Sequence, residues 1–244
     1  MNQEHDPNVD AFNHDIANNE GYLYSTNASL SSQMANRRMT DAALESTDFQ
    51  GKRVVDVGAG DGTYTLELYD RGQPACIYGV DMAQEAIRIA QERVGDRQIV
   101  YEVNSAYALP CEASSFDITH LRGVLHHMDR PADALKEGLR VSSSMVVIEP
   151  NGYNPVLKLL ERFSRYHIEH REKSYSARQL RRWVMDAGGR VVHQKFIGLV
   201  PMFCPDWFAR IMKFIEPVAE RIPLINVCGC AQVVIVAVRV AQEK

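Results

Sequence analysis

Three glycines at alternate positions, 58, 60 and 62, directly after an apolar stretch constrain this chain more than any other feature. The apolar stretch 53–57 predicts a buried strand, and the amphipathic stretch 63–71 predicts a helix. Glycines in such a place accept the backbone angles of a sharp strand-to-helix turn and let a ligand approach the main chain. A strand, a glycine turn and a helix together predict the first unit of a parallel sheet covered by helices. A tight turn that binds nothing is the alternative interpretation.

The same alternation continues along the chain, which indicates an α/β sheet rather than separate α and β regions. Ser174 or Ser176 is expected to cap the helix at 177–187, and serines 142–144 are expected to form a turn. The predicted strands are 53–57, 76–80, 99–103, 116–121, 145–149, 191–196 and 233–238. The predicted helices between them are 63–71, 84–94, 131–139 and 177–187.

The 244 residues suit a single domain with a helical arm at 1–50 and two long insertions, 150–176 and 199–230. A net charge of -4 argues against a nucleic-acid partner. The five cysteines are scattered and odd in number, which favours a reducing, cytoplasmic compartment; no pair has zinc spacing, so we predict no metal. The polar start lacks a signal peptide, and no apolar stretch is long enough to span a bilayer, so we predict no membrane partner.

The spacing and charge of the glycine loop indicate what it binds. The glycines read G-x-G-x-G, whereas a dinucleotide fingerprint reads G-x-G-x-x-G. Asp56 and Asp61 disfavour a pyrophosphate and suit a ligand with a cationic centre, such as S-adenosylmethionine. Asp81, at the tip of the second strand, is suited to accept hydrogen bonds from two ribose hydroxyls, and Met82 is suited to pack on an adenine face. Capping the helix that starts near residue 84 is a second role for Asp81.

Through these and further motifs, the segment 51–149 resembles the class I S-adenosylmethionine-dependent methyltransferases of the small-molecule type. The resemblance rests on Val-Asp-Val-Gly-Ala-Gly-Asp-Gly-Thr (55–63), Gly-Val-Asp-Met (79–82), Ala-Leu-Pro (108–110), Ser-Phe-Asp (115–117) and Val-Leu-His-His-Met (124–128), in this order and spacing. It implies a doubly wound, seven-stranded, mostly parallel sheet of Rossmann-like type. It also implies that the last strand is antiparallel and inserted between strands five and six.

The resemblance further implies the cofactor-binding residues, with S-adenosylmethionine as methyl donor and S-adenosylhomocysteine as product. An acid usual in the family before the Leu-Pro pair is replaced here by Asn104-Ser105-Ala106, and the Ser105 hydroxyl is the expected substitute. The segment 142–144 stands where the family often has Pro-Gly-Gly. The predicted cofactor-binding set is Asp56, Gly58, Ala59, Gly60, Gly62, Asp81, Met82, Ser105 and Ala106.

The acceptor side of the predicted site is less constrained by the sequence. Methyl transfer to a hydroxyl needs a base, and His126 or His127 after the fourth strand is the candidate; packing under the cofactor is the alternative. Tyr153, Asn154 and His167 are candidate substrate contacts. The basic stretch 161–182 suits an anionic substrate or a solvated helix face. The apolar stretch 203–215 suits a lid over a lipophilic substrate, core packing or a homodimer contact.

The function predicted from the sequence is methyl transfer to a small molecule, most naturally to a hydroxyl of a natural product or sugar. A non-catalytic S-adenosylmethionine-binding module or partner subunit is the first alternative. A nicotinamide oxidoreductase on a related sheet is the second, and the glycine spacing counts against it.

Overall fold

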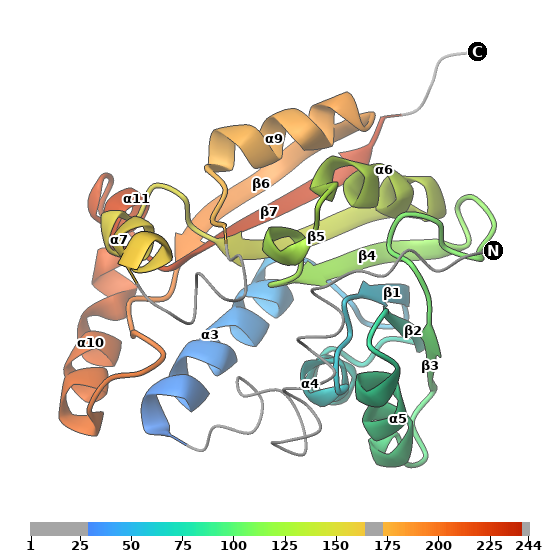
Figure 1. Ribbon diagram of the computed structural model, residues 1–244, viewed down its shortest axis with the longest axis horizontal. Helices are drawn as coiled ribbons and strands as arrows, with labels where there is room; N and C mark the ends of the chain where they lie inside the picture. The colour runs from blue at the N-terminus through green and yellow to red at the C-terminus, as the bar shows by residue number, and fades with distance from the viewer. Residues whose placement is uncertain (1–28, 164–172, 241–244) are drawn as a thin grey trace.

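The computed structural model describes residues 29–163 and 173–240 and contains a single seven-stranded sheet (Figure 1). The strands are β1 (Arg53–Val57), β2 (Cys76–Asp81), β3 (Ile99–Val103), β4 (Phe116–Arg122), β5 (Ser142–Pro150), β6 (Gly189–Ile197) and β7 (Gln232–Arg239). The helices are α3 (Leu30–Ser46), α4 (Thr63–Gly72), α5 (Gln84–Arg93), α6 (Pro131–Val141), α7 (Pro155–Phe163), α9 (Ala177–Asp186), α10 (Asp206–Ala219) and α11 (Ile225–Gly229), with a 3-10 turn η1 at Leu125–His127.

The order of the strands across the sheet is β3-β2-β1-β4-β5-β7-β6. The strands β1 to β5 are parallel to one another, and β7 runs antiparallel to both β5 and β6. This confirms the mostly parallel sheet and the antiparallel last strand inserted between strands five and six. The strands after β1 are added on one side of it as far as β3, and from β4 on they are added on the other side. In open α/β sheets, ligands bind in the crevice at such a switch in strand order.

Both faces of the sheet are covered, because alternate residues of each strand point to opposite sides. On one face Val54 and Ile118 pack with residues of α3, α4 and α5. On the other face Val55 and Leu121 pack with residues of α6 and α9. The strand β7 is buried along most of its length, as its continuous apolar run requires.

The serines at 142–144 do not form the predicted turn, which is a correction to the sequence analysis. They begin β5, where Ser142 pairs with Phe116 and Ser144 pairs with Ile118. The buried Ser142 hydroxyl donates to the carbonyl oxygen of Gly138 in α6 and lies 2.8 Å from it, so its polar group is satisfied by the preceding helix. The predicted cap at Ser176 is confirmed, since its side chain accepts from the Gln179 amide.

The long insertions contain helices of their own. The stretch 150–176 includes α7, and the stretch 199–230 includes α10 and α11. Of the predicted arm at 1–50, the structure describes α3, while residues 1–28 lie outside the described ranges. None of the described helices is both long and apolar enough to cross a bilayer. Among residues 29–163 and 173–240, no cluster of three or more metal-ligating side chains could hold a metal ion.

Candidate functional site

The glycine loop after β1 uses its amide groups to fix its own shape. The amides of Gly58 and Ala59 both donate to the Val80 carbonyl oxygen, at 2.8 and 3.0 Å. The Gly60 amide donates to Oδ2 of Asp81 at 2.9 Å, and the Gly62 amide donates to the Ala59 carbonyl oxygen at 3.1 Å. The loop is therefore held against the end of β2 by hydrogen bonds that leave none of these four amides for a ligand.

This arrangement determines whether the loop suits an anionic or a cationic group of a ligand. A phosphate needs donated N–H groups, and these are already consumed. The carbonyl oxygens of Gly58 and Gly60 accept no hydrogen bond from the described residues, and three carboxylates lie in or beside the loop at Asp56, Asp61 and Asp81. The loop thus presents acceptors and negative charge, which suit an ammonium or sulfonium group and oppose a pyrophosphate.

Gly58 also allows the loop after β1 to touch the turn after β4. Its φ is +78°, and a Cβ built on it would lie 2.4 Å from Cγ2 of Val124. A similar close approach occurs at Gly62, where a Cβ would lie 2.8 Å from the Tyr101 hydroxyl oxygen. Glycine is required at these two positions by both backbone angle and space. The ends of β1 and β4 are consequently in direct contact.

Comparing Gly58→Ala with Gly188→Ala separates the cost of the left-handed backbone from the cost of the close contact with Val124. Gly188 has a φ of +83° with nothing within 4 Å of a built Cβ, so Gly188→Ala should cost only the left-handed backbone, about 1–2 kcal/mol. Gly58→Ala should cost roughly 1–3 kcal/mol more, because Val124 must move. Urea unfolding of both variants measures the difference. Equal losses would show that the contact with Val124 is not tight.

Asp81 occupies the end of β2 and braces both neighbouring segments. Besides the Gly60 amide, its carboxylate accepts from the Ala83 amide at 2.9 Å, just before α5 begins. The predicted N-cap role of Asp81 is wrong, because Ala83 is the N-cap of α5 and no side chain caps it; Asp81 instead accepts the amide of that N-cap residue. Burial raises the pKa of Asp81, while the bonds from these backbone amides act in the opposite direction. Two oxygens offer about four acceptor positions, so the carboxylate keeps capacity for ribose hydroxyls.

Asp56 lies deeper than the sequence analysis assumed. It is buried, and its two oxygens bond His120 Nδ1 at 2.8 Å and the Thr65 hydroxyl at 2.6 Å. His120 is itself buried, and its Nε2 has no hydrogen-bond partner. The pair connects β1 to β4 beneath the glycine loop. Asp56 thus supports the loop from below, and its predicted contact with the methionine end of a cofactor stays a prediction.

The other predicted cofactor residues lie on neighbouring loops at the same edge of the sheet. Met82 is exposed directly after Asp81. The Asn104 amide donates to the Asp81 carbonyl oxygen at 3.1 Å, which holds the loop after β3 beside the end of β2. Ser105 accepts from the Tyr107 amide at 3.2 Å, and Ala106 is buried in the core.

Glu149 organises the turn after β4, and the sequence analysis did not single it out. The side chain is completely buried at the end of β5. One oxygen accepts from the amides of Val124 and Leu125, both at 2.8 Å. The other accepts from the His126 amide at 3.2 Å and from His126 Nδ1 at 2.8 Å. An acid at the tip of a strand, as at Asp81, is the signal that could have identified it.

These bonds fix the tautomer of His126. The Glu149 oxygens already accept three backbone amides, and the oxygen that faces His126 Nδ1 accepts a hydrogen bond in the same way, so Nδ1 is assigned as the donor. In a neutral ring Nε2 is then the nitrogen that accepts a proton. His127 lies against it, with ring centroids 3.9 Å apart. The structure thus presents His126 as the oriented histidine of the predicted pair.

The polar loop after β5 is held mainly by the segment before β7. Asn151 Nδ2 donates to the carbonyl oxygens of Val227 and Cys230, at 2.7 and 2.9 Å. Asn154 donates to Cys230 and caps α7 by accepting from the Val156 amide at 2.9 Å. Asn154 therefore has a structural role, whereas Tyr153 is exposed. His167 lies outside the described residues. The substrate roles of all three stay predictions.

Arg122 ends β4 and is a second residue that the sequence analysis missed. Its guanidinium donates to the Thr40 hydroxyl and to the Asn36 carbonyl oxygen, both at 2.8 Å, and lies 3.8 Å from the Tyr64 ring centroid. It forms no ion pair with a carboxylate of the described residues, and burial lowers its pKa. This cation at the end of an apolar strand was visible in the sequence.

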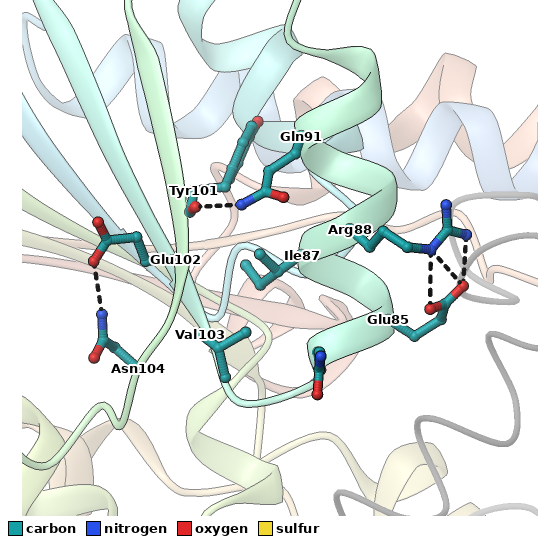
Figure 2. A pocket seen from close by; sticks show the side chains of 9 residues that line it. Glu85, Ile87, Arg88, Gln91, Tyr101, Glu102, Val103 and Asn104 are labelled. Carbon is teal, nitrogen blue, oxygen red and sulfur yellow. Dashed lines mark hydrogen bonds and ion pairs between the residues drawn. The ribbon is translucent and has the colours of Figure 1, made fainter.

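A groove of about 750 Å³ between α5 and β3 borders these residues, because Asn104, whose amide bonds the end of β2, is one of the residues that line it (Figure 2). Its two walls are joined by a hydrogen bond from Gln91 of α5 to the Tyr101 carbonyl oxygen of β3 at 2.9 Å, and Arg88 pairs with Glu85 within α5. None of the predicted catalytic or cofactor residues lines it. The candidate site is therefore the edge where the loops after β1, β2 and β4 meet, and not this groove.

Comparisons with known proteins identify the part of the chain that is similar to methyltransferases. Residues 55–146 match the model of a methyltransferase domain. Erythromycin 3''-O-methyltransferase of Saccharopolyspora erythraea is 35% identical over 103 residues, covering 39% of this chain and 33% of the relative. An uncharacterized methyltransferase of Schizosaccharomyces pombe is 28% identical over 156 residues and covers 55% of each chain. The chain spans about half the length of the first curated relatives that it matches.

Among solved structures, a methyltransferase from Haloferax volcanii, determined in complex with the Trm112 activator, has a TM-score of 0.69 at 19% identity. The superposition covers 94% of this chain and 98% of that one, which shows a common fold. The matched segment contains the glycine loop, Asp81 and the turn after β4. Residues 55–146 therefore belong to the methyltransferase domain family, in its class I S-adenosylmethionine-dependent form.

Proposed function

We propose that this protein transfers a methyl group from S-adenosylmethionine to a hydroxyl of a small molecule, such as a natural product or a sugar. The observation that carries the proposal is the glycine loop, whose four amides are consumed and whose Gly58 and Gly60 carbonyl oxygens accept no hydrogen bond from the described residues. Carboxylates in and beside the loop add negative charge. This loop touches the turn that holds an oriented histidine. A single edge of the sheet thus combines a place for a cationic cofactor with a candidate base.

The residues present fit the cofactor group by group. The carbonyl oxygens of Gly58 and Gly60 suit the ammonium, and Arg122 suits the carboxylate. Asp81 suits the ribose hydroxyls, with Met82 exposed beside it for the adenine. When bound, S-adenosylmethionine supplies a methyl group activated by a positively charged sulfur.

His126 gives the proposal its acceptor chemistry. Glu149 holds the ring through Nδ1, so Nε2 is the nitrogen that can take the proton of an attacking hydroxyl. Glu149 also stabilises the positive charge that the ring then carries, because its carboxylate lies 2.8 Å away. An O-methyltransferase among the relatives supports the same acceptor atom.

Calorimetric titration with S-adenosylhomocysteine, with NADH as a control ligand, tests the cofactor assignment. We expect micromolar binding of the first ligand and none of the second. Asp81→Ala should weaken the affinity roughly tenfold to a hundredfold, because hydrogen bonds from a carboxylate to the ligand and to the loop are both lost. Since its pKa is raised, the wild-type affinity should fall on acidification at a pH above the ordinary range of an aspartate.

Asp117→Ala is the matched control, because Asp117 also accepts a backbone amide, that of Arg53 at 2.8 Å, but at the start of β4. Its affinity should equal that of the wild type. Binding of NADH instead would overturn the proposal in favour of an oxidoreductase. Tight binding of S-adenosylhomocysteine without turnover of any hydroxyl, amine or carbon acceptor would favour the alternative of a non-catalytic binding module.

A further inference from the structure

The helix α7 turns its apolar side to the solvent. Val156, Leu159, Leu160 and Phe163 form one stripe along the helix, since each turn places the next of them three or four residues further on. All four are exposed, Phe163 to 70%, and no residue of the helix is buried. Glu161 points the opposite way, where it accepts from the Ser174 amide at 2.8 Å. This is the reverse of an ordinary surface helix, whose apolar stripe faces the core.

The helix α10 is inverted in the same manner. Trp207, Ile211, Phe214 and Val218 are exposed along one side, Phe214 to 85%. The buried residues are two alanines and Glu216, whose carboxylate accepts from the Leu199 amide at 2.9 Å. The inner contact of α10 is thus made by small and hydrogen-bonded side chains, while its large apolar groups face outward.

The two stripes belong to one end of the molecule. Figure 1 shows α7, α10 and α11 gathered at the same end, away from α5. Asn154, before α7, donates to the Gly229 carbonyl oxygen at the end of α11, and Asn226 of α11 donates to Glu220 after α10. Leu224 precedes α11 with a φ of +70° and is 76% exposed. We call this surface the apolar end-face; it comprises the exposed apolar side chains of α7, of α10 and of residues 222–225.

Charge distinguishes the kinds of partner that fit the apolar end-face. Arg162 and Arg210 are exposed beside the apolar stripes. Glu161 and Glu216, two of the three acids of these helices, are turned inward. The whole chain has a net charge of -4, so the positive character is local. An isologous dimer through this face would bring the same arginines of two copies together, which is unfavourable.

We propose that the apolar end-face docks on the surface of an anionic phospholipid membrane. Exposed Trp, Phe and Leu side chains enter the boundary between headgroups and acyl chains, and the arginines remain at the level of the phosphates. The sequence analysis predicted no membrane partner because the chain lacks a spanning segment. Docking parallel to the surface needs no such segment, and it rests on no property of the methyl-transfer site.

Co-sedimentation of the full chain with vesicles tests the proposal. The vesicles contain phosphatidylcholine alone, or phosphatidylcholine with phosphatidylglycerol. The protein should bind the anionic vesicles, and Arg210→Glu should weaken this binding about fivefold or more, since each surface cation contributes about one such factor. Leu159→Asp/Phe214→Asp should abolish it. Met185→Asp is the matched control, because Met185 is an exposed apolar residue of α9 outside the apolar end-face.

Emission from Trp207, recorded in a Trp183→Phe background, should shift to the blue on addition of anionic vesicles. Affinity for S-adenosylhomocysteine should be unchanged in Leu159→Asp/Phe214→Asp, which confirms that the variant is folded and separates this proposal from the methyltransferase assignment. Three results would overturn the proposal: protein that stays in the supernatant, an equal loss in Met185→Asp, or a dimer that the double variant dissociates without any vesicle binding. Trp207 emission already shifted in the free protein and insensitive to vesicles would also overturn it.

Discussion

Glu149→Ala is expected to lower the free energy of unfolding by about 3–5 kcal/mol, because a buried acceptor of several hydrogen bonds is lost at once. The change removes the acceptor for the amides of Val124, Leu125 and His126 and for the His126 ring, all in a buried place. Each donor left without a partner costs roughly 1–3 kcal/mol unless water or a shift of the backbone supplies a new one. Urea unfolding followed by circular dichroism measures the loss.

Glu216→Ala is the control for this variant. Glu216 is another buried carboxylate that accepts a backbone amide, but in α10 and far along the chain from the turn after β4. Both variants should be destabilised, whereas only Glu149→Ala should also weaken the binding of S-adenosylhomocysteine, because the turn that it supports touches Gly58. A loss below about 1 kcal/mol in Glu149→Ala would contradict the role assigned to this carboxylate.

His126→Gln is expected to lower the turnover of a hydroxyl acceptor by roughly 10²–10⁴-fold, the usual contribution of a positioned general base. Glutamine can keep a hydrogen bond to Glu149 but cannot take a proton. The loss should shrink at alkaline pH, where the acceptor hydroxyl ionises without assistance. Steady-state kinetics between neutral and alkaline pH measure both effects, with an acceptor identified by screening.

His193→Gln, on β6, is the control, since this histidine is exposed and outside the site. Affinity for S-adenosylhomocysteine should be unchanged in both variants. A loss in His126→Gln that is the same at every pH would indicate a packing role for the ring. An amine acceptor that is methylated at full rate by His126→Gln would move the proposed acceptor from oxygen to nitrogen.

The sheet was predictable because its signal is local. Each strand is an apolar run, and each turn carries its own glycines or polar residues, as at 58–62 and at Gly188. The serines at 142–144 were misjudged because the groups that satisfy them, such as the Gly138 carbonyl oxygen, come from the preceding helix. A polar run was therefore taken for a turn although groups distant from it in the local pattern satisfy its hydroxyls.

The site was predictable only where one segment carried the motif. Gly58, Gly60 and Asp81 lie within short patterns. Glu149 accepts hydrogen bonds from a turn more than 20 residues away in the sequence. His120 bonds Asp56 because β1 and β4 are neighbouring strands. Such pairings depend on the register of the strands, which composition does not reveal. The amphipathic pattern of α7 is visible in the sequence, but which side of the helix faces the protein depends on Glu161 and Ser174 meeting in three dimensions.

The place of β7 has a consequence for how the protein is made. In the described part of the chain, β6 hydrogen-bonds to β7 and reaches β5 only through it. During synthesis, the first five strands can assemble as residues emerge, since each of them neighbours a strand already made. The strand β6 must wait for Gln232–Arg239 to leave the ribosome, and until then the apolar edge of β5 is open. Nascent chains paused between residues 198 and 231 are therefore the ones that most need a chaperone.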